Sequence, residues 1–302
     1  MDSIGIKELF AKVNSWQKGD KRAPHKPLLI LYALGRYSRG EPREIQFTPE
    51  FDTKFTQLLR EFGTSKSPSN SHHPFWYLRN DGIWKVSKET GMVSRKGKKN
   101  EPLKRELIRY QVSGGFTEFT YQKILEDRSL LIDLAEQTLE LNFPESLYED
   151  ILSAVGLDLS KNILGKKKRD PQFRERVMRA YEYRCAICGF DVRLGNMSVG
   201  LDAAHIKWHQ AGGPDTEDNG LSLCVLHHKI FDLGGLTINF QMCVELSENL
   251  YGRQGFHENF NVFHGKPIYR PRNLSYQPNK LYLEWHKKQV FKEPALCTQA
   301  SD

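Results

Sequence analysis

Cysteine is scarce in this sequence of 302 residues, and no cysteine precedes Cys185. An odd number of cysteines, five in all and confined to one part of the chain, does not fit a disulfide framework. Cys185 and Cys188 stand three positions apart, a spacing at which two thiolates reach one metal ion. The scarcity therefore excludes a disulfide-rich secreted protein, and the spacing favours metal binding.

Long apolar runs, internal repeats and low-complexity segments are also lacking. No run approaches the roughly 20 apolar residues that span a bilayer. The first residues form an amphipathic segment charged by Lys7, Glu8 and Lys12, which does not match a secretory signal. We therefore expect no membrane partner and a cytoplasmic location. The length suffices for two domains, each with its own core.

Positive charge predominates, with 44 Lys and Arg against 37 Asp and Glu and a formal net charge of +7. Residues 1–125 hold 23 basic and 13 acidic side chains, whereas residues 126–160 hold 1 and 9. A basic excess in the first part favours a polyanionic partner such as nucleic acid. From charge alone, a solvated surface with an uneven distribution is an equally good interpretation.

Apolar periodicity predicts a mixture of helices and short strands. Helices are expected over residues 4–16, from Pro27 through Leu34, and over 52–62, 118–142, 146–155 and 172–182. The apolar runs 75–78 and 83–86 flank Asn80-Asp81-Gly82, which predicts a hairpin, and Gly114-Gly115-Phe116 predicts a further turn. Residues 95–99 form a basic loop.

A basic segment with Lys166 to Arg169, followed by Pro171, predicts a linker over residues 161–171. We therefore expect one domain over residues 1–160 and another over 172–302. The fold class is expected to be α+β, with a mainly helical first domain that contains a small β hairpin or sheet.

The second domain holds two pairs of candidate metal ligands with the same spacing, Cys185 with Cys188 and Cys224 with His227. Two such pairs suit a structural Zn²⁺ in tetrahedral coordination. Buried thiols without metal would not explain the repeated spacing. The 35 residues between the pairs are too many for an ordinary zinc finger, so a functional segment is expected between them.

That segment resembles the HNH (ββα-metal) endonuclease motif. The resemblance rests on the runs Asp202-Ala-Ala-His205-Ile206, Asn219-Gly220 and Cys224-Val-Leu-His227-His228-Lys229. It implies that His205, at the end of a strand over residues 199–204, is the general base that accepts a proton from water. It also implies that His228 binds a catalytic Mg²⁺ or Mn²⁺, and that Asn219 fixes the loop and orients the His205 ring.

The motif departs from the family pattern at one position. Many members place an acidic metal ligand directly before the base, where this sequence has Ala204 and the nearest acid is Asp202. Alternate residues of a strand share a face, so Asp202 is expected to point with Ala204 and away from His205. Asp202 would therefore need a bend or bulge to join His228 as the second metal ligand. An exchange of roles between His227 and His228 is a further alternative.

The first domain resembles the sulfur-binding domain of restriction endonucleases that attack phosphorothioated DNA. The resemblance rests on three segments, Arg22 to Pro27, His73 to Gly82 and Gly114 to Phe116. It implies that His73, Pro74 and Tyr77 form an apolar cup for sulfur. His73 stands where the family often has Tyr, and Tyr77 stands where a small residue can occur.

The physics of a phosphorothioate agrees with such a cup, because sulfur accepts hydrogen bonds poorly and loses less than oxygen on leaving water. Candidate contacts to the rest of the phosphate and to bases are Arg22, His25, Lys26 and Arg79.

Together the two resemblances imply a type IV restriction endonuclease that binds double-stranded phosphorothioated DNA and cuts nearby. A homodimer would supply the second active site for a double-strand cut. One alternative is an HNH endonuclease directed to another mark, such as methylcytosine. The other is a zinc-containing DNA-binding protein without catalysis.

Overall fold

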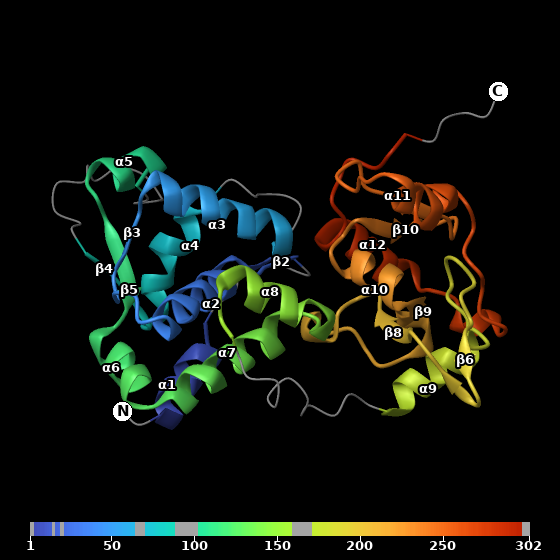
Figure 1. The fold of residues 1–302 in the computed structure, drawn as a ribbon, viewed down its shortest axis with the longest axis horizontal. Helices are drawn as coiled ribbons and strands as arrows, with labels where there is room; N and C mark the ends of the chain where they lie inside the picture. The colour runs from blue at the N-terminus through green and yellow to red at the C-terminus, as the bar shows by residue number, and fades with distance from the viewer. Residues whose placement is uncertain are drawn as a thin grey trace. The chain divides into compact units, whose positions relative to one another are not determined.

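The computed structural model of the chain describes residues 3–13, 16–18, 21–63, 70–87, 102–158 and 171–297, with only the backbone at 16–18, 21–23 and 171. The chain divides into two compact units, Met1–Gly165 and Lys166–Asp302 (Figure 1). The basic loop 95–99 and the linker residues Lys166 to Arg169 lie outside the described residues. No helix in the described part has the length and apolarity needed to cross a bilayer.

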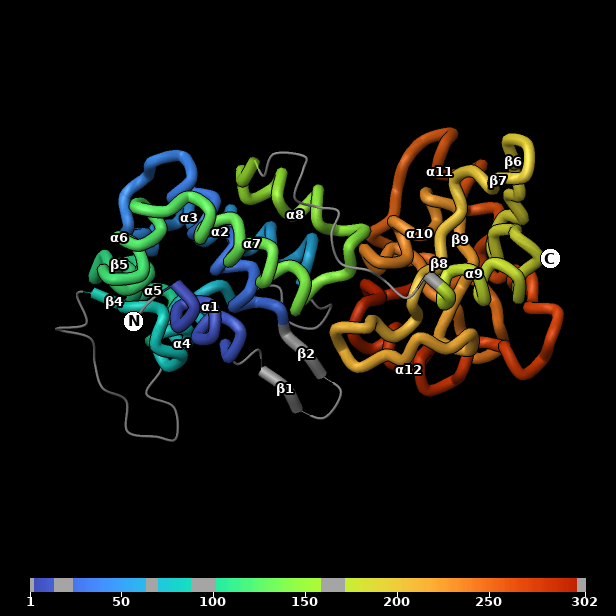
Figure 2. The backbone as a smooth tube through the Cα atoms, turned by 90° about the horizontal axis from the view of Figure 1, so that it is seen from below, coloured from blue at the N-terminus to red at the C-terminus, as the bar shows by residue number. Residues whose placement is uncertain are grey.

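The first unit is built around α2 (His25–Ser38), which buries an uninterrupted stretch from Pro27 to Gly35. Four helices pack directly on α2, and α1 packs on one of them (Figures 1 and 2). The helices around α2 are α1 (Ser3–Ala11), α3 (Pro49–Phe62), α4 (His72–Tyr77), α7 (Arg128–Asn142) and α8 (Tyr148–Val155). A helix this apolar on all sides is expected at the centre of a bundle.

The predicted helices are confirmed here, with shifted ends. The first stops at Ala11, before a hairpin of β1 (Trp16–Lys18) and β2 (Lys21–Ala23). The segment 118–142 is divided at Asp127 into α6 (Glu118–Glu126) and α7. The Asp127 carboxylate accepts from the backbone N–H of Ser129 and so begins α7 as an N-cap. A short helix α5 (Lys104–Arg109) completes the set.

The predicted hairpin over 75–86 is wrong. Its first half is helical, in α4 and a 3-10 helix (Leu78–Asp81) that ends at Gly82 with φ +78°. Its second half, β4 (Trp84–Ser87), instead pairs with β5 (Ser113–Phe116) in an antiparallel sheet of order β3-β5-β4, where β3 is Ile45–Gln46. An aromatic run beside Asn-Asp-Gly fits a helix end as well as a hairpin turn.

The turn predicted at Gly114 and Gly115 is also wrong, because both residues lie in β5. Glycine is needed at both positions because neighbouring residues pack closely against the backbone. A Cβ on Gly114 would lie 2.6 Å from Nε1 of Trp84, and one on Gly115 would lie 2.3 Å from the Arg43 carbonyl oxygen. Glycine within a strand marks such close approaches.

The second unit centres on an antiparallel hairpin of β8 (Leu201–His205) and β9 (Gly220–Cys224). Two helices pack against it, α9 (Pro171–Ala180) and α10 (Val225–Asp232). The surrounding elements are β6 (Arg193–Leu194), β7 (Met197–Ser198), β10 (Leu236–Ile238), β11 (Val244–Leu246), α11 (Gln254–Asn259) and α12 (Lys280–Gln289). The ββα order of β8, β9 and α10 and the α+β class agree with the sequence-based prediction.

The two faces of this hairpin contact different helices. Ser222 lies 3.6 Å from the Met178 sulfur of α9, and a Cβ on Gly220 would collide with Val177 of the same helix. Cross-strand partners share a face, so Ala203 and His205, opposite Ser222 and Gly220, face α9 as well. By alternation the residues between them face α10.

Candidate functional site

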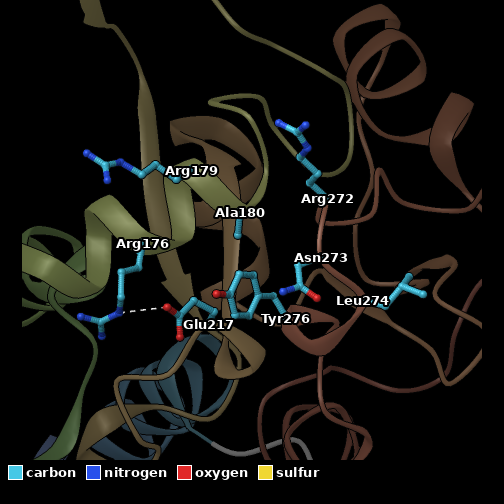
Figure 3. Close-up of a pocket in the computed structure, with 8 residues that line it drawn as sticks. All are labelled: Arg176, Arg179, Ala180, Glu217, Arg272, Asn273, Leu274 and Tyr276. Carbon is cyan, nitrogen blue, oxygen red and sulfur yellow. Dashed lines mark ion pairs between the residues drawn. The ribbon is translucent and has the colours of Figure 1, made fainter.

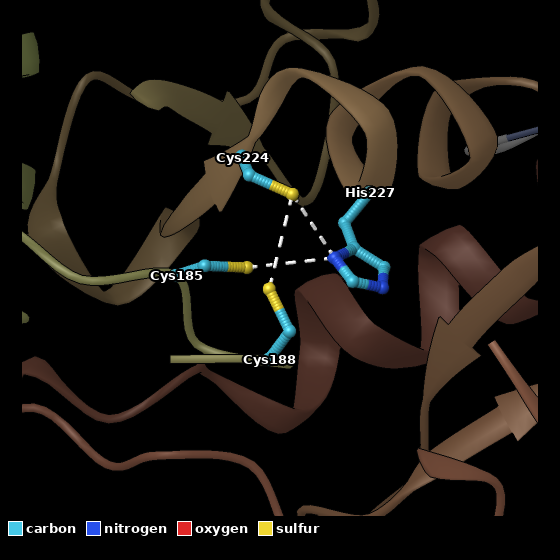
Figure 4. A group of neighbouring side chains, drawn as sticks. All are labelled: Cys185, Cys188, Cys224 and His227. Carbon is cyan, nitrogen blue, oxygen red and sulfur yellow. Dashed lines mark hydrogen bonds between the residues drawn. The ribbon is translucent and has the colours of Figure 1, made fainter. Parts of the chain in front are cut away.

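Three cysteines and one histidine converge in the second unit (Figure 4). Cys185 and Cys188 come from the turn after α9, Cys224 ends β9 and His227 lies in the first turn of α10. Their ligand atoms all lie within 4.8 Å of one another. A tetrahedral ion with sulfur at about 2.3 Å and nitrogen at about 2.0 Å separates its ligands by roughly 3.5 to 3.8 Å. The cluster therefore fits one tetrahedral metal ion.

The histidine of the cluster is His227. The Nδ1 atom of His227 lies 3.1 Å from Sγ of Cys224 and 3.7 Å from Sγ of Cys185. Its Nε2 atom, at 2.8 Å from the Asn259 carbonyl oxygen, donates to it, which leaves Nδ1 as the atom able to bind metal. The structure therefore brings His227 next to the three cysteines, and its role as a zinc ligand stays a prediction.

The electrostatics of the cluster favour a cation. Burial acts to lower the pKa of His227, but the sulfur atoms of Cys185 and Cys224 outweigh it and raise the pKa to about 10. Hydrogen bonds from Cys188 and Cys224 lower the pKa of Cys185. A site that holds a proton this tightly on an imidazole is one where a metal ion would replace that proton.

His205 lies on the α9 face of the hairpin. Its ring stacks on Phe173 of α9, with centroids 4.1 Å apart and an angle of 16° between the rings. Its Nε2 atom lies 2.7 Å from Oδ1 of Asp215. An aromatic floor and a carboxylate partner fix the orientation of the ring, as general-base histidines require.

His228 belongs to α10, which packs on the other face of the hairpin, and its side chain is buried there. Its Nδ1 atom is 3.4 Å from Oδ2 of Asp202, and its Nε2 atom is 3.1 Å from Oδ2 of Asp232. Burial acts to lower the pKa of His228, but the two carboxylates outweigh it and raise the pKa to about 9. Asp202 and His228 could thus contribute two ligands to a divalent ion.

The expected bend at Asp202 is wrong, because β8 keeps a continuous register with β9 from Leu201 to His205. Asp202 reaches His228 without a bulge because α10 packs on the face to which Asp202 points. The same alternation directs His205 to α9, whereas His228 lies in α10 on the Asp202 side. They flank the hairpin from opposite faces.

Asn219 is fully buried beside this hairpin. Its Oδ1 atom accepts from the backbone N–H of Lys207, and its Nδ2 atom donates to the carbonyl oxygens of Lys207 and Pro214. These hydrogen bonds hold the loop, and a role for Asn219 in catalysis stays a prediction. In the described residues the ring of His205 takes Asp215 as its partner instead, a residue that sequence reasoning missed because no motif marks it.

In the first unit, His25 and His73 lie near each other. The Nε2 atom of His25 is buried and has no hydrogen-bond partner among the described residues. Burial, and to a smaller extent His73, lowers the pKa of His25 to about 4, so the imidazole is neutral at pH 7. The ring of His73 also lies edge-on to Tyr77, with centroids 6.2 Å apart.

The other residues of this unit that were predicted to bind DNA differ in their burial and in their partners. Lys26 pairs with Asp81 at 2.5 Å, and the two side chains are only 16% and 5% exposed. Arg79 lies over the Trp76 ring, with Cζ 3.7 Å from its centroid. Pro74 is buried. Arg22 lies in β2, and its side chain is outside the described part.

Each of the two units matches a different protein family. The model of the ScoMcrA-like, DNA sulfur-binding domain matches residues 5–160, and that of the HNH endonuclease matches residues 185–239. No curated protein sequence matches the chain.

Among solved structures, the sulfur-binding domain of ScoMcrA complexed with phosphorothioated DNA is 20% identical, over 50% of this chain and 94% of that one, with a TM-score of 0.44. The corresponding complex of SprMcrA is 19% identical, over 52% and 95%, with a TM-score of 0.44. The type IV phosphorothioation-dependent restriction endonuclease ScoMcrA is 19% identical, over 50% of this chain and 27% of that one, with a TM-score of 0.41.

Proposed function

Because the chain belongs to the ScoMcrA-like DNA sulfur-binding domain family and also carries an HNH endonuclease domain, we propose that it is a type IV restriction endonuclease. It binds double-stranded DNA that carries a phosphorothioate and hydrolyses phosphodiester bonds nearby. The observation that carries the proposal is the presence of both domains in one chain. The domain limits at residues 160 and 172, the homodimer and the cytoplasmic location stay predictions.

Recognition of sulfur is proposed to depend on His25, His73 and Tyr77. Burial keeps the His25 imidazole neutral, so it adds no charge that would attract a phosphate oxygen, whereas the less hydrated sulfur loses less on entering such a site. Pro74, which the resemblance places in the cup, is buried within α4, the helix that also carries His73 and Tyr77, so His25 takes its place in this proposal. Arg22 and Arg79 are the proposed contacts to the remaining phosphate oxygens, and Lys26, already paired with Asp81, holds the site in place.

The binding step is tested with matched duplexes of one sequence, with and without a single phosphorothioate, in fluorescence anisotropy. We expect tighter binding of the sulfur-containing duplex. Equal affinity for both duplexes would contradict recognition of sulfur. Preference for a methylcytosine duplex of the same sequence would instead support the alternative mark.

Tyr77→Glu is expected to remove the preference for sulfur, because a carboxylate beside the mark repels the anionic phosphorothioate. The measurement is the ratio of the two dissociation constants from the duplex pair. Tyr110→Glu is the matched control, because Tyr110 is also half-buried and lies at the end of another helix. This variant is expected to keep the preference for sulfur. Undiminished discrimination by Tyr77→Glu would remove Tyr77 from the proposed cup.

Cleavage is proposed to use both faces of the β8–β9 hairpin. In the described residues β8 pairs with β9 alone, so the other edge of β8 has no strand partner. A phosphodiester along this edge is flanked by His205 on one side and by Asp202 with His228 on the other. His205 accepts a proton from the attacking water, and Asp215 holds the imidazolium that results.

Two kinds of ion fit the proposed enzyme. Zn²⁺ suits Cys185, Cys188, Cys224 and His227, where it braces the fold. Mg²⁺ or Mn²⁺ suits Asp202 and His228 and would neutralise charge on the phosphate and the departing oxygen.

Asp202→Asn is expected to raise the Mn²⁺ concentration needed for half-maximal cleavage by at least about tenfold, because a neutral amide is a weaker ligand than a carboxylate. The check is the cleavage rate of marked DNA across a Mn²⁺ titration. Asp191→Asn, at an exposed aspartate of the same unit, should leave the titration unchanged. Coinciding curves for Asp202→Asn and the wild type would exclude Asp202 as a ligand.

A further inference from the structure

A pocket of about 670 Å³ opens beside α9 in the second unit (Figure 3). Three of its eight lining residues are arginines and one is acidic. The lining residues are Arg176, Arg179, Ala180, Glu217, Arg272, Asn273, Leu274 and Tyr276. All belong to the second unit, and none belongs to the metal cluster or to the proposed catalytic residues.

The pocket is connected to His205 through a short chain of contacts. Arg176 donates from Nη2 to the Asp215 carbonyl oxygen at 2.7 Å, and the Asp215 carboxylate contacts His205 at 2.7 Å. Phe173, one turn before Arg176 on α9, stacks on the His205 ring. One helix face therefore runs from the proposed base to the pocket.

The charge of the pocket is only partly neutralised from within. Arg176 pairs with Glu217 at 3.1 Å, as the dashed line in Figure 3 marks, so this acid does not oppose the other two arginines. Arg272 is exposed and Arg179 has a side chain that is 72% exposed. Arg179 pairs with Glu175 one turn away on the helix surface, an exposed contact of little strength that a phosphate would outcompete.

We propose that this pocket binds a backbone phosphate of the DNA that is being cut, with Arg179 and Arg272 as the contacting cations. Arg176 links this phosphate site to the loop that holds Asp215. From Phe173 to Arg179 the helix rises about 9 Å. Since a DNA strand advances about 3.4 Å per nucleotide, the phosphate lies about two to three nucleotides from the bond that His205 attacks. The inference rests on the proposed nuclease function and adds the path of the DNA across the second unit.

The test uses the full chain with Arg179→Ala and Arg272→Ala combined, and unmarked duplex DNA without added Mg²⁺ or Mn²⁺. Each phosphate contact contributes about 0.9 to the slope of log Kobs against log salt concentration. Because both arginines are proposed to contact one phosphate, the double variant is expected to reduce the magnitude of this slope by about 0.9. On marked DNA with Mn²⁺, we expect KM to rise severalfold while kcat changes less than twofold. Arg253→Ala, an exposed arginine outside the pocket, is the control and keeps the wild-type slope and KM.

The outcomes separate this inference from the proposed function. An unchanged salt slope in the double variant would overturn the phosphate pocket, even if the wild type cuts marked DNA. A reduced slope supports it by binding alone, even if no cleavage is detected and the nuclease proposal fails. A loss of kcat with unchanged KM would also overturn it, because it would show that the arginines act in the chemical step.

Discussion

Replacing His205 with alanine is expected to abolish cleavage of marked DNA while leaving its binding intact. A positioned general base contributes about 10²–10⁴-fold to the rate, and its loss affects only the chemical step. The measurement pairs an initial-rate cleavage assay with anisotropy on the same sulfur-containing duplex. We expect a loss of at least about a hundredfold in rate and a dissociation constant within twofold of the wild type.

His209→Ala is the matched control, because His209 lies close to His205, with ring centroids 6.3 Å apart, but is exposed, and it is His205 whose ring nitrogen contacts Asp215. It is expected to keep the wild-type rate. If His205→Ala still nicked DNA at that rate, another residue would have to be the base. If it lost binding as well, the role of His205 would be structural.

Cys185→Ser is expected to have the largest effect on stability, because it removes one of four ligands from the metal cluster. Binding of structural zinc contributes about 10–16 kcal/mol in zinc-finger peptides. The whole stability of a typical domain is about 5–15 kcal/mol. The second unit should therefore lose its metal and its cooperative thermal transition, while the first unit keeps its own.

The measurements are metal content by mass spectrometry and unfolding followed by calorimetry. Cys243→Ser is the control, because Cys243 is a half-buried cysteine outside the cluster and its thiol donates to the Gln241 carbonyl oxygen at 3.8 Å. It should bind one zinc per chain and unfold like the wild type. A fully folded, metal-free Cys185→Ser protein would contradict the structural role of the ion.

The metal cluster was the part of the site that the sequence predicted best. Cys185 with Cys188 and Cys224 with His227 have the same local spacing, and a turn or a helix start brings each pair together without help from the rest of the fold. The central helix α2 was predictable for a related reason, since its run of apolar residues requires burial. Both signals are local and need no knowledge of which elements meet.

The hairpin predicted over 75–86 failed because its outcome depends on a distant partner. Trp84 pairs with Phe116, and the close fit of Gly114 on the Trp84 ring makes β5 the better partner for β4. With β4 paired to β5, the segment before it forms the helix α4 and not a strand. A pattern of aromatic residues near a glycine does not contain this information.

The surroundings of His205 also depend on contacts between distant segments, which the sequence did not predict. Strand alternation correctly separated Asp202 from His205, but it did not reveal that α10 would cover the Asp202 face. Asp215 lies ten positions after His205 in a loop that carries no motif, and only the fold brings the two together. Geometry therefore adds a partner for the proposed base and moves the proposed metal site to the opposite face of the hairpin.

The central claim is that sulfur in the DNA backbone directs cutting by the second unit. It is tested most directly with two preparations of one plasmid, phosphorothioated and unmodified, incubated with the purified full chain and Mn²⁺ and resolved on a gel. The account predicts that the phosphorothioated plasmid is cleaved and the unmodified plasmid stays supercoiled. Equal cleavage of both, or cleavage of neither, would contradict it.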